Sequence, residues 1–271
     1  MSEVNSIKKI YIEAQEKIKS SVFTTGFDDL DIFCKYLSNG CILTIGGRPA
    51  MGKTSFATSL VNHLLSINKN ILFFSLELSK GKFIQRMIAE KIGEPIFSIL
   101  ENKINERELD ITLNSYEDKN FEIVDEHNLT IEKFEDKIKT SKPEIVFVDY
   151  VQLLEMPKAP NLTEATNLAI KEIKRIAVEN NIIVILLSQL SRAVEARCDK
   201  TPLLSDLRNG SLLEEISDII LFIYREEYYD SNTETPMNLI ITAKNSVGPT
   251  GTVCLDFKNG FFKNKSYYNG F

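Results

Sequence analysis

The chain of 271 residues is long enough for one large or two small domains, with a formal net charge of −6, 43% hydrophobic and 26% charged residues. This is the composition of a globular protein, and no apolar run reaches the ~18 residues that a membrane span needs, which argues against a membrane protein. The negative charge argues against nucleic-acid binding over the whole surface, although it permits a narrow basic strip on one loop.

The first predicted element is a short amphipathic helix over residues 5–19. Ile7, Ile10 and Ile18 lie near helical spacing among Lys and Glu. A lone helix of this length is marginal in water, so we expect it to pack on another surface. The same stretch has acidic residues and no apolar core run, so it is not a signal peptide, and we expect a cytoplasmic protein.

Short runs rich in Ile, Val, Leu and Phe then alternate with longer amphipathic stretches. The runs are typical of strands buried on both faces of a parallel sheet: CILTIG (41–46), NILFFSLE (70–77), FEIVDE (121–126), EIVFVDY (144–150), IIVILLSQL (182–190) and DIILFIYR (218–225). The intervening stretches have the length and composition of helices: 53–67, 80–92, 105–118, 130–140 and 163–180. This alternation predicts a doubly wound α/β domain with a mostly parallel sheet.

The C-terminal part changes character. NLIITAKN, TVCLDF and FFKNK are separated by the turn signals VGPTG and KNG, a pattern that predicts antiparallel hairpins at one edge of the sheet. Two long polar stretches, 155–163 and 226–236, are candidates for mobile surface loops. The four cysteines form no C-x-x-C pair, so we expect reduced, mostly buried thiols rather than a zinc site.

A phosphate-binding motif follows the first predicted strand. GRPAMGKT fits G-x-x-x-x-G-K-[ST] in full and precedes a predicted helix, which is the required context. Lys53 would reach the β- and γ-phosphates of ATP, and the Thr54 hydroxyl would ligate Mg²⁺. The predicted nucleotide-binding residues of this segment are Gly47, Arg48, Pro49, Ala50, Met51, Gly52, Lys53, Thr54 and Ser55.

Polar residues end three of the predicted strands. Asp149 is expected in the crevice at the carboxyl ends of the parallel strands, holding the Mg²⁺ shell through water; a cap of the next segment is the alternative. If the strand before Glu77 neighbours the P-loop strand, Glu77 faces the γ-phosphate and activates the attacking water; otherwise it is a surface glutamate. Gln189 could sense the γ-phosphate, or it could be a plain polar strand end.

These motifs, in this order, resemble the ATPase domain of the DnaB family of hexameric replicative helicases over residues 21–257. The resemblance is carried by TTGFDDLD, GGRPAMGKTSFA, FSLELS, VDYVQLL, SQLSRAVEAR, SDLRNGSLLEEISDIILFIYR and AKNSVGPTG. It implies a linker-like helix in residues 1–20 and a RecA-like P-loop NTPase domain in 21–271. It also implies a hexameric ring with ATP between subunits and single-stranded DNA in the channel.

The resemblance also implies roles for individual residues. Glu77 would be the catalytic base, Asp149 the Walker B acid and Gln189 the link between the γ-phosphate and DNA, with Arg86 near the active site. The loop residues that would grip the DNA backbone are Arg208, Asn209 and Ser211. Such contacts position DNA without reading its sequence. Taken alone, an arginine in such a loop is more often a solvated surface residue.

Two departures from the family pattern stand out. The family's last hairpin carries Lys-x-Arg, whose cations reach the neighbour's γ-phosphate, but here Ser246 follows Lys244 at the arginine position. An arginine finger accelerates hydrolysis by roughly 10³–10⁵-fold, so either Lys244 acts alone, Arg225 substitutes, or hydrolysis is weak. We also expect the family's N-terminal helical domain to be absent, with the helix over 5–19 docking on the adjacent subunit or packing on its own domain.

The leading functional hypothesis is an ATP-driven, ring-forming translocase on single-stranded DNA, with a primase or loader as a further partner. The alternatives are a RecA-like recombination or loader ATPase, and a nucleotide-gated assembly protein with weak hydrolysis. No constellation that recognises the base is evident. Tyr224, Tyr228 and Tyr229 could stack on nucleotide or nucleic acid, or they could serve packing and surface roles.

Overall fold

The computed structural model describes residues 7, 9, 11, 12, 23–155, 159–207, 210–230 and 232–265. Within these residues one sheet runs in the order β3-β2-β4-β5-β1-β6-β7-β8-β9. The parallel part consists of β1 (Ile42–Gly47), β2 (Ile71–Ser75), β3 (Phe121–Val124), β4 (Ile145–Asp149), β5 (Ile183–Gln189) and β6 (Ile219–Arg225). The antiparallel edge consists of β7 (Asn238–Asn245), β8 (Gly251–Lys258) and β9 (Phe261–Lys263). The predicted parallel sheet with C-terminal hairpins is confirmed.

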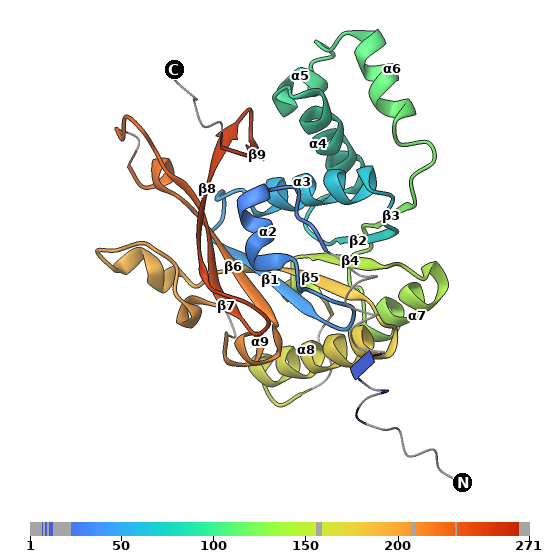
Figure 1. The fold of residues 1–271 in the computed structure, drawn as a ribbon, viewed down its shortest axis with the longest axis vertical. Coiled ribbons are helices and arrows are strands. Elements are labelled where there is room, and N and C mark those ends of the chain that lie inside the picture. Colours follow the sequence, from blue (N-terminus) through green and yellow to red (C-terminus); the bar gives the residue numbers. More distant parts are fainter. Residues whose placement is uncertain are drawn as a thin grey trace.

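Helices cover both faces of the sheet (Figure 1). One side carries α2 (Asp28–Cys34), α3 (Lys53–Ser66), α4 (Lys80–Ile92), α5 (Ile96–Leu100) and α6 (Glu106–Asn114). The other carries α7 (Ile131–Ser141), α8 (Leu162–Glu179) and α9 (Gly210–Ile216). Short 3₁₀ turns complete the chain: η1 (Val151–Leu153), η2 (Arg192–Ala196), η3 (Leu204–Asp206) and η4 (Glu226–Tyr228).

Two hydrophobic clusters explain why the apolar runs are continuous rather than alternating. In β4, Ile145 and Phe147 belong to the cluster under α3 and α4, whereas Val146 and Val148 belong to the cluster over α7 and α8. Each strand residue therefore needs an apolar side chain whichever face it points to. This arrangement fixes the carboxyl ends of the parallel strands along one edge, where the P-loop begins.

The structure also answers a question that the sequence left open and adds elements that the sequence did not predict. The strand before Glu77, β2, does not neighbour the P-loop strand β1, because β4 and β5 lie between them. The short helices α2 and α5 were not predicted, and η4 lies inside the stretch 226–236, which was a candidate for a mobile surface loop. The predicted helix over 5–19 lies almost wholly outside the described residues, as does part of the loop 155–163.

The cysteines only partly match the expectation of buried thiols. Cys34 is buried, and burial raises its pKa to about 12. Cys41 and Cys254 are half-buried and Cys198 is exposed, so fewer of the thiols are fully buried than expected. Where the chain is described, no cluster of His, Cys, Asp and Glu could hold a metal by itself. The described helices also include none of the length and apolarity that crossing a bilayer requires.

Candidate nucleotide-binding site

The P-loop connects the end of β1 to the first turn of α3. Gly52 precedes the helix with a φ of 93°, in the left-handed region that glycine adopts without strain. A Cβ at Gly52 would also lie 3.0 Å from the ring of Phe262. Lys53 is 8% exposed, and its Nζ donates to the carbonyl oxygens of Gly47 at 3.0 Å and Arg48 at 3.2 Å. The loop therefore curls around the amine that would bind phosphate.

Asp149 lies beside the start of α3, although the two are far apart in sequence. The Thr54 hydroxyl donates to Asp149 Oδ2 at 2.8 Å, and the carboxylate is 1% exposed. Asp149 Oδ1 is buried and has no hydrogen-bond partner. A buried carboxylate oxygen without a partner is costly, so this atom is suited to a metal shell.

Glu77 reaches the same site by a route that the sequence did not indicate. The backbone N–H groups of Leu76 and Glu77 donate to the carbonyl oxygen of Asp149 at 2.8 Å and 3.3 Å. This contact holds the segment after β2 against the end of β4, its actual neighbour. Glu77 therefore lies near Lys53 and Asp149 without adjacency of β2 and β1.

Most of these residues line one open cavity of about 340 Å³, and Asp149 lies beside it through its hydrogen bond to Thr54. Its walls are Pro49, Ala50, Gly52, Lys53, Thr54, Ser55, Glu77, Leu78, Arg86, Gln189, Phe257 and Gly260. Most of the predicted nucleotide-binding and catalytic residues therefore come together in space. Arg48 instead borders an adjoining cavity that shares Pro49 and Gln189, and Met51 is buried in the core.

Phe257 and Gly260 were missed by the sequence reading. They come from β8 and the turn after it, and only the packing of this hairpin beside the P-loop brings them to the cavity. The Arg225 guanidinium lies 3.7 Å from the centre of the Phe257 ring, and its Nη1 donates to the Ala50 carbonyl at 3.4 Å. The KNG turn signalled the hairpin, but nothing in the local pattern indicated what the hairpin contacts.

The three tyrosines considered for stacking do not line this cavity. Tyr224 and Tyr229 stack with ring centres 5.8 Å apart, and Tyr228 meets Tyr229 edge-on at 5.0 Å. Their rings are therefore used largely in contacts with one another.

Burial and like charge shape the ionisation of the site. Burial, with repulsion from Glu77, raises the pKa of Asp149 from its ordinary value of 3.8 to about 6, against the opposing effects of the Thr54 hydrogen bond and the Lys53 charge. Burial lowers the pKa of Lys53, while Asp149 and Glu77 oppose that shift. A site with two carboxylates and one desolvated amine favours an added divalent cation, so these residues fit Mg²⁺.

Lys244 lies away from this cavity. It pairs with Ile220 near the start of β6, whereas the P-loop follows the end of β1, which runs parallel to β6. Lys244 Nζ donates to the carbonyl oxygens of Glu214 at 2.5 Å and Glu215 at 3.2 Å, at the C-terminal end of α9. The lysine is therefore at the opposite end of the sheet from the P-loop of its own chain.

The predicted DNA-binding residues cannot be placed in the same way. Arg208 and Asn209 lie outside the described residues, and of Ser211 only the backbone is described, within the first turn of α9. Ser246, at the position of the expected arginine, donates its backbone N–H to the Asp218 carbonyl at 2.8 Å.

Comparisons with known proteins agree over nearly the whole chain. The family model described as DnaB-like helicase C terminal domain matches residues 23–266. A probable replicative DNA helicase of Trieres chinensis is 34% identical over 97% of this chain and 62% of its own length. Replicative DNA helicase DnaB of Buchnera aphidicola (Schizaphis graminum) is 34% identical over 98% of this chain and 59% of its own length. The chain thus spans about three fifths of each of these relatives.

Solved structures agree with the sequence comparisons. The ATPase domain of G40P has a TM-score of 0.89 and 32% identity, covering 97% of this chain and 100% of that one. A DnaB-like replicative helicase, described with its interactions with primase, has a TM-score of 0.86 and 32% identity, covering 96% of this chain and 67% of that one.

Proposed function

From the premise that this chain belongs to the family of DnaB-like helicase C-terminal domains, we propose that it hydrolyses ATP and uses the energy to move along single-stranded DNA. The observation that carries the proposal is the site in which Lys53, Thr54, Glu77, Arg86 and Gln189 line one cavity, while Asp149 accepts the Thr54 hydroxyl hydrogen bond beside it. It contains a phosphate-binding lysine, a metal-binding pair and a carboxylate placed to act on water. A nucleotide-binding scaffold would need only the first two.

Each residue has a distinct part in this reaction. Lys53 exchanges its two carbonyl acceptors for oxygens of the β- and γ-phosphates, which also removes the cost of its buried charge. Glu77 accepts the proton of the attacking water, while Gln189 and Arg86, which line the same cavity, contact the γ-phosphate. Thr54 and Asp149 hold the Mg²⁺ ion, which neutralises charge on the phosphates when bound.

The raised pKa of Asp149 leads to a pH prediction. Below about pH 6 this carboxyl is protonated, so Mg²⁺ binding must displace a proton. We expect Mg²⁺-dependent nucleotide affinity to weaken by up to about tenfold per pH unit below that point. Titration with a fluorescent ATP analogue, with and without Mg²⁺, measures it. Asp149→Asn should abolish this additional pH dependence, and an Asn variant with an unchanged profile would refute the assignment.

The position of Lys244 supports assembly into a ring. Because it lies at the far end of the sheet from its own P-loop, it can meet a γ-phosphate only in a neighbouring subunit. We propose a hexamer with one nucleotide at each interface and single-stranded DNA contacted through Arg208, Asn209 and Ser211. A primase or loader as partner, docking of the helix over 5–19 on an adjacent subunit, and a cytoplasmic location belong to the same proposal.

One observation favours a second candidate, a nucleotide-gated assembly protein with weak hydrolysis. Ser246 cannot supply the charge of the family's arginine, and Lys244 already donates to two carbonyl oxygens of α9. Arg225 does not compensate across the interface, since it stacks on Phe257 beside its own P-loop.

Steady-state ATP hydrolysis with and without single-stranded DNA, at low salt, separates the two candidates. The proposal predicts hydrolysis that DNA stimulates and that Lys53→Ala abolishes. Nucleotide binding without turnover, whether or not DNA is present, would instead identify the assembly protein.

A further inference from the structure

A closed loop over residues 190–207 follows Gln189 directly. Leu190 and Leu207 form an antiparallel bridge, and the Ser191 N–H donates to the Asp206 carbonyl at 2.7 Å, so both ends of the loop lie side by side. The loop contains the two 3₁₀ turns η2 and η3. It thus begins beside the γ-phosphate wall of the cavity and returns to the same place before the chain enters the segment proposed to contact DNA.

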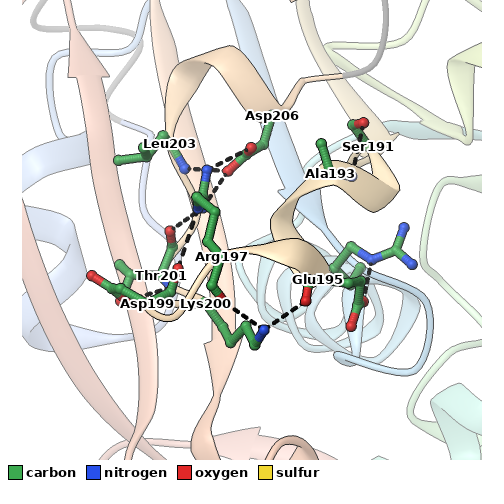
Figure 2. Close-up of polar contacts among 10 residues, drawn as sticks. Ser191, Ala193, Glu195, Arg197, Asp199, Lys200, Thr201, Leu203 and Asp206 are labelled. Atoms are coloured by element: carbon green, nitrogen blue, oxygen red, sulfur yellow. Dashed lines mark hydrogen bonds and ion pairs between the residues drawn. The ribbon is translucent and has the colours of Figure 1, made fainter.

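A partly buried ion pair makes this loop one unit (Figure 2). Arg197 donates from Nη1 and Nη2 to the two oxygens of Asp206, both at 2.8 Å, and the Asp206 side chain is only 4% exposed. Arg197 Nη2 also donates to the Thr201 carbonyl at 2.7 Å, and the Leu203 N–H donates to Asp206 at 2.8 Å. A bidentate pair of this kind fixes orientation as well as distance, so η2 and η3 should move together.

Lys200 ties the middle of the loop to η2. Its Nζ donates to the Glu195 carbonyl at 2.6 Å and also to the Arg197 carbonyl. Figure 2 shows Lys200 directed at the turn that carries Glu195, on the side away from Asp206. The backbone of Glu195 is therefore fixed to the same unit as Arg197 and Asp206.

One side chain joins this unit to the P-loop. Arg48 donates from Nε to Glu195 Oε1 at 2.8 Å and from Nη1 to the Leu190 carbonyl at 2.8 Å, and its side chain is 11% exposed. The carbonyl of the same residue accepts from Lys53 Nζ at 3.2 Å. Arg48 thus lies between the amine that binds phosphate and both the start and the η2 turn of the loop.

We propose that the Arg48–Glu195 ion pair is a positioning contact that couples nucleotide occupancy to DNA binding, through the Arg197–Asp206 unit. When phosphate replaces the Arg48 carbonyl as acceptor for Lys53, the backbone of Arg48 is released, and its side chain carries the change to the loop. Arg48 and Glu195 position the loop over residues 190–207 relative to the P-loop and do not contact the reacting atoms. This inference rests on the proposed function, since it requires that both ATP and single-stranded DNA bind.

Glu195→Gln tests the contact, because it removes the charge while preserving size. The quantity to measure is the ratio of affinities for a labelled oligo-dT strand with and without a non-hydrolysable ATP analogue. We expect this ratio to fall about fivefold or more towards one, a change within the usual range of allosteric coupling. The rate of ATP hydrolysis without DNA should stay within about twofold of wild type. By reciprocity, the gain in analogue affinity on adding DNA should fall by the same factor. Glu195→Asp should restore part of the ratio.

A matched control is available at the other end of the sheet. Glu144 pairs with Lys69 at the same 2.8 Å and is 42% exposed, against 39% for Glu195. Glu144→Gln should leave the affinity ratio unchanged, and an equal loss in this variant would attribute the effect to general loosening and overturn the inference. A wild-type ratio in Glu195→Gln also overturns it. If the wild-type protein itself shows no coupling between nucleotide and DNA binding and no DNA-stimulated hydrolysis, the proposed function is refuted, and this inference is refuted with it.

Discussion

Glu77→Gln is expected to lower the turnover number for ATP by about 10²–10⁴-fold, the range typical of a general base, while nucleotide affinity stays near wild type. The amide retains the size and hydrogen bonding of the side chain but cannot accept a proton from water. Glu77 lines the cavity with Lys53 and Thr54. Its side chain is exposed and is not part of the hydrophobic core, so the substitution should not disturb packing. Single-turnover hydrolysis, together with binding of a fluorescent ATP analogue, would separate the chemical step from binding.

Glu126 provides a matched control for Glu77. It follows the end of β3 by two residues, as Glu77 follows the end of β2. However, β3 is the edge strand, and Glu126 pairs with Lys133 rather than facing the nucleotide cavity. Glu126→Gln should therefore hydrolyse ATP at the wild-type rate. Equal losses in both variants, or a Glu77→Gln enzyme of normal turnover, would contradict the role of Glu77 as the base.

Lys244→Ala is expected to reduce hydrolysis by about 10³-fold or more, the lower end of the effect of a cationic finger on phosphoryl transfer. With Ser246 at the position of the arginine, Lys244 is the cation of this hairpin that remains to reach the neighbour's γ-phosphate. The loss should appear in the turnover number of the assembled protein and not in the nucleotide affinity of a single subunit.

A mixing experiment distinguishes this role from a structural one. Lys244 also caps α9, so its loss alone could weaken the fold. In mixed assemblies of Lys244→Ala and Glu77→Gln subunits, some interfaces combine an intact Glu77 with an intact Lys244 from the neighbour. Activity should therefore return when the two inactive proteins are mixed. Mixed assemblies that remain inactive would show that Lys244 does not act across the interface.

Local patterns were enough to predict the phosphate site and the secondary structure around it. The predicted strands match β1 to β6. The five helices predicted to begin at residues 53, 80, 105, 130 and 163 correspond to α3, α4, α6, α7 and α8. Each of these features depends on residues close together in the chain, such as the glycines before Lys53 or the apolar run before Asp149. Short elements such as α2 and α5 carry too few residues for a periodicity to be evident.

The contacts between distant segments were decided by the tertiary structure alone. The sequence left open whether β2 neighbours β1, because the order of the strands depends on where each crossover helix packs, and in the fold β4 and β5 lie between them. The same holds for Phe257 at the cavity, for Lys244 at the far end of the sheet and for the Arg48–Glu195 ion pair. The spacing of residues encodes local geometry, whereas contacts across a sheet follow from how whole elements bury their apolar faces together. The sequence by itself thus determined which groups could bind a nucleotide, and the packed fold determined which of them meet.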